Sequence, residues 1–149
     1  TVVAAYRRAL DLQAQGEDVF RAALPQLMQE LDCASHRDSD TGFLCGAPAQ
    51  PGGAEGFHQS AEYVGRVMSE SGGDGMAQVQ LKNRFYAGDA WSVLQPDGVR
   101  TMSAPTFHIT GESEELTTYG VAGTLLTMRF PFAVTPGDLI RGPVRNHRN

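Results

Sequence analysis

The stretch SHRDSDTGF, residues 35–43, holds the residue types that nucleophilic hydrolysis uses: a serine, a histidine and acidic partners. A serine nucleophile needs a histidine within hydrogen-bond reach and an acid behind it, normally drawn from distant parts of the chain. Ser35 and His36 are adjacent, so their side chains diverge in any regular structure. A self-contained hydrolase using Ser35, His36 and Asp38 remains one alternative. The pattern favours a second interpretation, in which these short polar side chains cap backbone amides at a junction.

Metal ligation is another chemistry to consider, because the chain holds four histidines and two cysteines. Cys33 and Cys45 stand twelve residues apart with no second pair, whereas a structural zinc or iron–sulfur site uses about four ligands. The histidines show no ligand-like spacing. We therefore predict no metal or other cofactor in this chain and expect both thiols to be reduced.

Basic and aromatic side chains alternate after residue 81, a pattern that can bind single-stranded nucleic acid by stacking and charge. In a small barrel, aromatic residues more often form the core, and this applies to Phe85, Tyr86, Trp91 and Phe107. The candidate contacts to nucleic acid or substrate are the basic residues Lys82, Arg84, Arg141 and Arg145. A formal net charge of -5 argues against a general affinity for phosphate backbones.

Composition places these residues in a globular chain. The 149 residues are 41% hydrophobic and 19% charged, which is typical of a folded domain. No apolar run approaches the roughly 20 residues that span a bilayer, so we expect a cytoplasmic protein without a membrane partner. The sequence opens with Thr1 inside a helical pattern, and we expect it to be part of a longer polypeptide.

Two helices are predicted at the N-terminus. Apolar residues recur at three- and four-residue spacing over residues 1–15, and Gly16 is suited to follow a helix end. A second amphipathic pattern begins near Asp18 and runs to about Cys33, with Pro25 tolerated if it lies in the first turn.

Beyond the Pro- and Gly-rich residues 47–56, the hydrophobic period changes from 3.6 to 2. Residues 76–85 send Ala77, Val79 and Leu81 to one face, as a half-buried antiparallel strand does. Further strands are predicted at residues 63–68, 91–94, 99–102, 107–109 and 124–130. Short strands at roughly ten-residue spacing without intervening helices predict a small closed or nearly closed β-barrel.

Turn signals separate these strands. SGGDG at residues 71–75 can reverse the chain, and Asp97 with Gly98 is a hairpin signal in which both central residues tolerate positive φ. Gly-Asp is repeated directly before an apolar strand, in AGDAW and in PGDLI. The turn-forming residues are Gly88, Asp89, Pro136, Gly137 and Asp138, of which Pro136 and Gly137 fit the centre of a type II turn.

Three motifs, SHRDSDTGF, KNRFYAGDAWSVLQPDG and FPFAVTPGDLIR, together resemble the C-terminal part of the collagenase-like peptidase family U32, in the same order and at similar spacing. The junction signature of this resemblance consists of Ser35, His36, Arg37, Thr41, Gly42 and Phe43. Cys45 departs from the expected aromatic or aliphatic residue, and residues 95–98 shorten a glycine-rich turn.

The resemblance implies an accessory domain. Members of the family carry an upstream α/β-barrel catalytic region with a cysteine cluster, followed by a small barrel similar to the second domain of translation elongation factors. Some are described as proteases, and others hydroxylate transfer or ribosomal RNA with an iron–sulfur cluster. The resemblance places that cluster upstream and assigns no catalytic residue to this chain.

These observations predict an α+β, mainly β fold, with N-terminal helices followed by a small antiparallel barrel. Residues 1–45 are expected to be the helical end of a catalytic region and its junction, residues 46–60 a linker, and residues 61–149 the accessory barrel. The expected function is to recognise or position substrate for that region. An RNA-binding module and a structural or dimerisation barrel are the alternatives, and the oligomeric state stays open.

Overall fold

The computed structural model describes residues 1–37, 42–46, 57–109 and 118–145. The chain divides into two compact units, unit 1 (Thr1–Ser60) and unit 2 (Ala61–Asn149). No helix among the described residues is long and apolar enough to cross a lipid bilayer.

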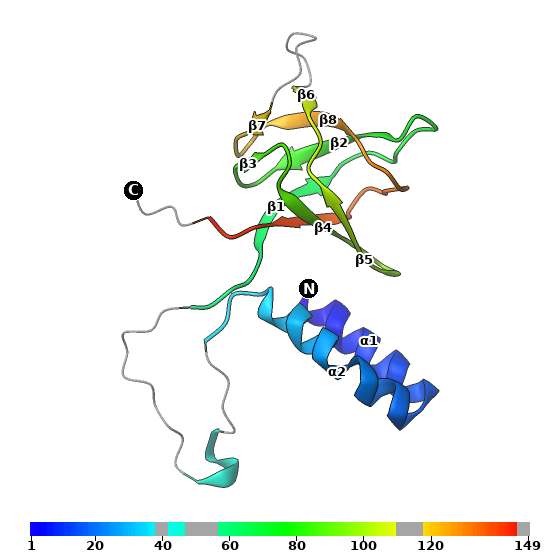
Figure 1. Cartoon of the computed structure of the whole chain (residues 1–149), viewed down its shortest axis with the longest axis vertical. Coiled ribbons are helices and arrows are strands. Elements are labelled where there is room, and N and C mark those ends of the chain that lie inside the picture. Colours follow the sequence, from blue (N-terminus) through cyan, green and yellow to red (C-terminus); the bar gives the residue numbers. More distant parts are fainter. Residues whose placement is uncertain (38–41, 47–56, 110–117, 146–149) are drawn as a thin grey trace. The chain divides into compact units, whose positions relative to one another are not determined.

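Unit 1 is built on two consecutive helices, α1 (Val2–Gln15) and α2 (Glu17–Asp32), which lie side by side (Figure 1). Gly16 joins them with a φ of 135°, so the predicted helix stop at this glycine is confirmed. The prediction that Pro25 lies in the first turn of its helix is wrong, because α2 begins at Glu17 and continues through Pro25. Proline has no N–H, so α2 lacks one backbone hydrogen bond at this point.

Unit 2 is a curled antiparallel sheet of seven strands in the order β5-β4-β9-β1-β2-β8-β6. These strands are β1 (Glu62–Val67), β2 (Met76–Leu81), β4 (Ala90–Gln95), β5 (Gly98–Ser103), β6 (Phe107–Ile109), β8 (Leu125–Arg129) and β9 (Leu139–Gly142). A second sheet pairs β3 (Phe85–Tyr86) with β7 (Tyr119–Gly120). The predicted fold class is confirmed, with the barrel present as a half-barrel.

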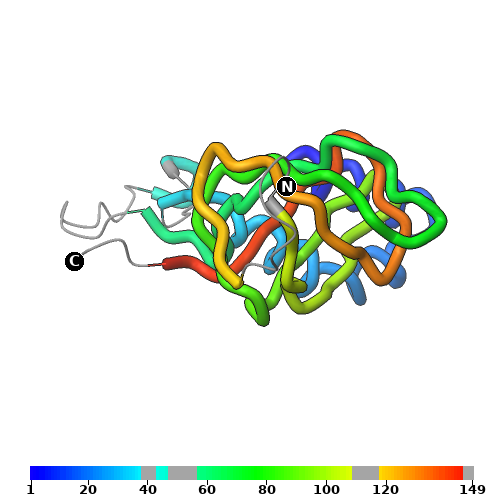
Figure 2. Tube along the Cα trace, turned by 90° about the horizontal axis from the view of Figure 1, so that it is seen from above, coloured from blue at the N-terminus to red at the C-terminus, as the bar shows by residue number. Residues whose placement is uncertain are grey.

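The sheet curls because its two outermost strands are neighbours in sequence. Only residues 104–106 separate β5 from β6. A connection of this length reaches about 14 Å from the last residue of β5 to the first of β6. Seven strands lying flat would place those ends about 29 Å apart. The trace of unit 2 accordingly curls round a common centre (Figure 2).

Strand β9, the last in sequence, lies inside this sheet. It pairs antiparallel with β1 on one side and with β4 on the other. It therefore connects the pair β4 and β5 to the remaining four strands of the sheet.

The core of unit 2 follows the predicted alternation. Strand β2 buries Ala77, Val79 and Leu81, as expected from its sequence. The predicted strand over residues 76–85 is interrupted at residues 82–84, and the chain resumes pairing in β3. The largest fully buried side chains are Trp91, Phe85, Phe107, Leu81, Leu126, Met128 and Ile140.

Two predicted reversals lie where expected. Gly75, with a φ of 78°, closes the turn before β2 by donating its N–H to the carbonyl of Gly72 at 2.9 Å. In the hairpin between β4 and β5, Gln95 pairs with Gly98, so Pro96 and Asp97 are the central residues. The expectation that Asp97 and Gly98 form the centre of this hairpin is therefore wrong by one residue. Among the described residues only glycines adopt positive φ, Gly98 among them at 150°.

Candidate recognition surface

His36 makes both backbone and side-chain contacts. Its backbone forms a two-way bridge with His58, with N···O distances of 2.9 and 2.7 Å. Its ring Nδ1 lies 2.8 Å from the carbonyl oxygen of Ala34, and Nε2 lies 3.8 Å from Oδ1 of Asp32. Both ring nitrogens therefore face local partners, and within the described residues no hydrogen bond joins Ser35 to His36. Asp38 and Thr41 lie outside the described residues.

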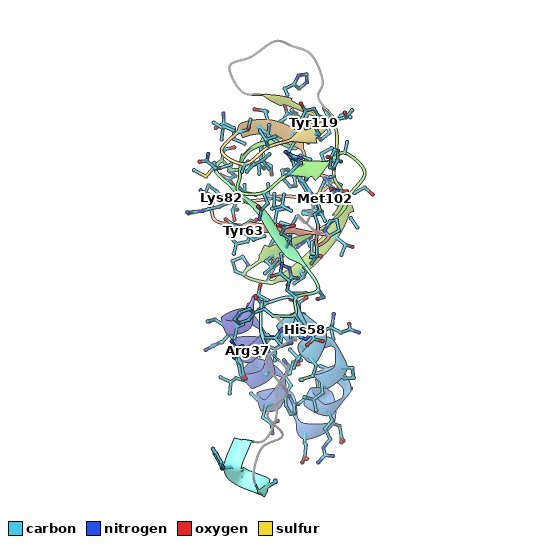
Figure 3. The ribbon with its side chains drawn as sticks, turned by 90° about the vertical axis from the view of Figure 1, so that its left-hand side faces the viewer. Arg37, His58, Tyr63, Lys82, Met102 and Tyr119 are labelled. Carbon is cyan, nitrogen blue, oxygen red and sulfur yellow. The ribbon has the colours of Figure 1, made fainter. Side chains whose placement is uncertain are left out.

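Two further contacts lie beside the backbone bridge between His36 and His58. The Arg37 guanidinium lies over the Phe57 ring, 5.1 Å from its centroid, and the Ser60 N–H donates to the Asp32 carbonyl at 2.9 Å. Arg37 and His58 can be followed in Figure 3. Gly42 and Phe43 belong to a short 3-10 helix, Gly42–Cys45, in which Phe43 is exposed. Of the junction signature, His36 thus contacts backbone groups and Arg37 contacts the Phe57 ring.

Metal-ligating residues do not gather in the described part of the chain. No three His, Cys, Asp or Glu side chains there lie close enough to hold a metal ion. Both cysteines are free thiols, and Cys33 is engaged locally, with its sulfur 3.4 Å from the Gln29 carbonyl. His147 lies outside the described residues.

The aromatic residues considered for base stacking are mostly internal. The Phe85 ring lies 4.6 Å from Trp91 and 5.0 Å from Phe107 between centroids, and all three side chains are buried. They form the centre of the barrel core and offer no face to a ligand. Tyr86, the residue after Phe85, is the exception, because the strand alternation turns it to the surface.

The two Gly-Asp sequences build the same local turn. Asp89 and Asp138 each donate a backbone N–H to the carbonyl three residues earlier, at 3.1 Å in both turns. Each carboxylate then accepts the N–H of that same earlier residue, at 2.8 Å in the first turn and 2.9 Å in the second. The preceding glycines have φ values of 90° and 104°, as the third position of a type II turn requires. The prediction for Pro136 and Gly137 is therefore confirmed.

The two carboxylates differ in the side chain that binds them from a distant part of the sequence. Asp138 is 3% exposed and accepts a hydrogen bond of 2.7 Å from Nε2 of Gln95. The same Gln95 nitrogen also donates to the Ala133 carbonyl at 3.0 Å. This second turn is therefore tied into the interior of the unit by a neutral amide.

Asp89 instead holds a cation at the surface. Its Oδ2 accepts a hydrogen bond of 2.5 Å from Nη2 of Arg145. The Arg145 guanidinium lies 4.5 Å from the centroid of the Tyr86 ring, and its backbone N–H donates to Oε2 of Glu62 at 3.3 Å. An ion pair, a cation–π contact and a backbone bond together fix the position of this arginine.

A second tyrosine completes the cluster. Tyr119 of β7 stands directly opposite Tyr86 of β3, with ring centroids 6.3 Å apart and an interplanar angle of 34°. Tyr86 is 42% exposed and Tyr119 52% exposed. We call Tyr86, Asp89, Tyr119 and Arg145 the tyrosine–arginine surface. Its side chains are two phenols, a carboxylate and a guanidinium, which offer ring contacts, hydrogen bonds and charge to a ligand.

The four predicted basic contacts occupy different environments. Lys82 and Arg84 are exposed and precede Tyr86 in the chain, and Lys82 lies at the periphery of unit 2 in Figure 3. Arg145 belongs to the tyrosine–arginine surface. Arg141 lies within β9 and is only 5% exposed, so its guanidinium is internal. Sequence reasoning missed Tyr119, because a two-residue strand has no readable period.

The sequence model described as "Peptidase family U32 C-terminal domain" matches residues 59–141. The chain belongs to this family. The match covers the seven-stranded sheet except Gly142, the last residue of β9, together with β3 and β7, and the resemblance is thereby confirmed. This U32 C-terminal domain thus includes the tyrosine–arginine surface up to its last member, Arg145, which follows the matched residues.

Two solved structures are similar to part of this chain. The C-terminal domain of a candidate U32 peptidase from Geobacillus thermoleovorans is 18% identical, with a TM-score of 0.50 over 56% of this chain and 93% of that one. Its selenomethionine variant gives 18% identity and a TM-score of 0.49, over 54% and 98% of the two chains. No curated protein matches this chain. At this identity the structural likeness concerns the fold alone.

Proposed function

We propose that this U32 C-terminal domain is a non-catalytic recognition module, which positions a macromolecular substrate for a catalytic region of the same polypeptide. The observation that carries the proposal is the tyrosine–arginine surface. Tyrosine and arginine are the residue types most enriched where protein interfaces gain their binding energy. Here two tyrosines of the matched residues and Arg145, four residues after the match ends, stand together and are partly exposed.

The preorganisation of Arg145 supports this role. A free arginine loses side-chain entropy when it binds, roughly 2 kcal/mol if fully immobilised. Asp89 and Tyr86 already hold the guanidinium in the unbound chain, so less of this cost falls on binding. The Asp89 carboxylate is itself paired, because its Oδ2 accepts hydrogen bonds from both Arg145 and the Tyr86 N–H. A ligand therefore does not meet an unpaired negative charge at this surface.

Unit 1 supports a docking role toward the catalytic region. Its two helices bury only Ala5 and Leu27, a small apolar core for 30 helical residues in α1 and α2. Large apolar side chains remain exposed on both helices, namely Val2, Val3, Tyr6, Leu10, Val19, Leu24 and Met28. A helix pair with so much exposed apolar surface gains stability when another structure covers it.

RNA is the second candidate substrate, and Lys82 and Arg84 favour it. Both are exposed within four residues of Tyr86, and an exposed tyrosine with adjacent cations suits a nucleic-acid strand. The formal net charge of -5 opposes this candidate, since RNA binding would have to rely on local charge. Polypeptide substrate is therefore the preferred version.

Fluorescence anisotropy of the whole chain tests both versions. The probes are a labelled collagen peptide and a labelled transfer RNA, each at low and at moderate salt. The test variant is Tyr86→Ala with Tyr119→Ala, and the matched control is Tyr63→Ala, a tyrosine 40% exposed on β1 outside the surface.

We expect peptide binding that falls at least about fivefold in the double variant and is unchanged in the control. RNA binding that weakens steeply with salt and falls in Lys82→Ala with Arg84→Ala would favour the second candidate instead. Binding of neither probe would overturn the recognition role and leave a structural or dimerisation barrel.

A further inference from the structure

The seven-stranded sheet of unit 2 ends in two strands of unequal length. β6 has three residues, whereas β5 has six. All six residues of β5 pair with β4 in one continuous register, from Gly98 opposite Gln95 to Ser103 opposite Ala90. Among the described strands, β4 is the only partner of β5. One long edge of the sheet is therefore open.

The hydrogen bonds of the next residue show which backbone groups face this edge. Ala104 donates its N–H to the Asp89 carbonyl and accepts from the Gly88 N–H, both at 2.7 Å. Backbone groups alternate in direction along an antiparallel strand, so Ala104, Met102 and Arg100 face β4. The N–H and C=O groups of Val99, Thr101 and Ser103 consequently point away from β4.

The usual protections of an edge strand are missing from β5. Natural edges carry a proline, a bulge or charged side chains that discourage further pairing. Residues 98–103 contain no proline, their register with β4 has no shift, and their one charge is Arg100. That side chain is occupied elsewhere, because it bonds to Asp97 at 3.0 Å and lies 5.6 Å above the Phe132 ring.

We infer that the open edge of β5 binds an extended polypeptide, which adds to the sheet as a further strand. The main-chain groups of Val99, Thr101 and Ser103 would bond to it irrespective of sequence. Alternate side chains of that polypeptide would point to the inner face, where Met102 and Phe132 pack partly buried against the core. An apolar residue at every second position is therefore the expected pattern of the ligand.

We choose a separate polypeptide, and not a second copy of this chain, as the ligand of the β5 edge. Each copy of the chain carries a formal net charge of -5, and repulsion between like-charged copies opposes self-association. This choice of occupant rests on the proposed recognition of polypeptide substrate. The open edge itself does not depend on that proposal, and strand β5 contributes no residue to the tyrosine–arginine surface.

The probe is a fluorescein-labelled octapeptide with valine at alternate positions, threonine between them and one lysine at each end. Binding to the whole chain is followed by anisotropy and by amide hydrogen exchange measured by NMR. We expect the amides of Val99, Thr101 and Ser103 to gain at least about tenfold protection at saturation. The amides of Arg100 and Met102, which already face β4, should change little.

Two perturbations test whether the backbone carries the binding. Thr101→Pro removes an N–H at the open edge without removing one that faces β4, whereas Thr101→Val keeps the backbone as its matched control. We expect at least about tenfold weaker binding in the proline variant and unchanged binding in the valine variant. N-methylation of alternate residues in the octapeptide gives the same test without altering the protein.

The outcomes are distinguishable. Octapeptide binding that ignores both Thr101→Pro and N-methylation, or no binding at 1 mM peptide (roughly the weakest specific affinity), overturns the inference. A concentration-dependent dimer that Thr101→Pro abolishes in sedimentation overturns the choice of occupant. Loss of octapeptide binding in Tyr86→Ala with Tyr119→Ala would assign the probe to the tyrosine–arginine surface and also overturn it. Retained edge binding beside a failed collagen-peptide test would instead count against the proposed function alone.

Discussion

The two Gly-Asp turns of unit 2 have one backbone geometry and two different uses. In both, an aspartate carboxylate accepts the N–H of the residue three positions earlier, and a glycine with positive φ precedes it. Asp138 is buried and binds the amide of Gln95, whereas Asp89 lies near the surface and binds the guanidinium of Arg145. The turn is a local property of the sequence. Its role is decided by the side chain that arrives from a distant segment.

The largest expected effect is the loss of stability when the buried carboxylate of the second turn is removed. Asp138→Ala removes the acceptor of three hydrogen bonds, from Gln95 and from the N–H and hydroxyl of Thr135. Because the site is buried, we expect the free energy of unfolding of unit 2 to fall by about 2–4 kcal/mol. Urea unfolding followed by the fluorescence of Trp91, the one tryptophan of the chain, measures it.

Asp97→Ala is the matched control for that measurement. Asp97 is also an aspartate of a tight turn and pairs with Arg100, but its carboxylate is exposed, so a change below about 0.5 kcal/mol is expected. Equal losses in the two variants would show that burial does not distinguish these carboxylates.

At the two glycines we expect equal losses of stability, smaller than the loss at Asp138. Gly88→Ala and Gly137→Ala each force an L-residue into left-handed backbone, at a cost of about 1–2 kcal/mol. Nothing lies within 4 Å of a Cβ added at either position, so backbone strain alone should act. Gly73→Ala, equally open but without positive φ, serves as the control and should leave stability unchanged. Values for Gly88 and Gly137 that differ by more than about 1 kcal/mol would contradict the shared geometry.

The smallest effect on stability should come from Asp89→Asn. The negative charge beside Arg145 is lost, but the amide oxygen can still accept from the Tyr86 N–H and the Tyr86 ring still contacts the guanidinium, so we expect a loss of about 1 kcal/mol. The consequence should instead be mobility of the arginine, seen as a reduced heteronuclear NOE of its Nε–H group in NMR. An equally ordered Arg145 in this variant would show that Tyr86 alone holds it.

Local features of this fold could be predicted from its sequence. The strand of residues 76–81 has a clear period of 2, and the turn at Pro136 and Gly137 uses residues whose backbone preferences are intrinsic. Pro25 shows the limit of such reasoning, because α2 continues through this residue despite the local preference of proline against a helix interior.

The candidate site was less predictable because it depends on long-range placement. Tyr119 meets Tyr86, and Arg145 meets Asp89, only after the sheet has curled around its core. Arg141 shows the converse. Its type suggests an exposed cation, but in the folded unit this residue of β9 is only 5% exposed, and nothing in its local sequence indicates that burial.

The interior position of β9 also has a consequence for biosynthesis. A ribosome delivers β1 to β8 first, but until residues 139–142 emerge the sheet lacks the strand that connects its two parts. A nascent chain must therefore keep two incomplete sheet fragments, with unpaired backbone edges, until translation of this domain is almost finished. A product truncated before Leu139 lacks β9, so it exposes those unpaired edges to chaperones and proteases instead of folding.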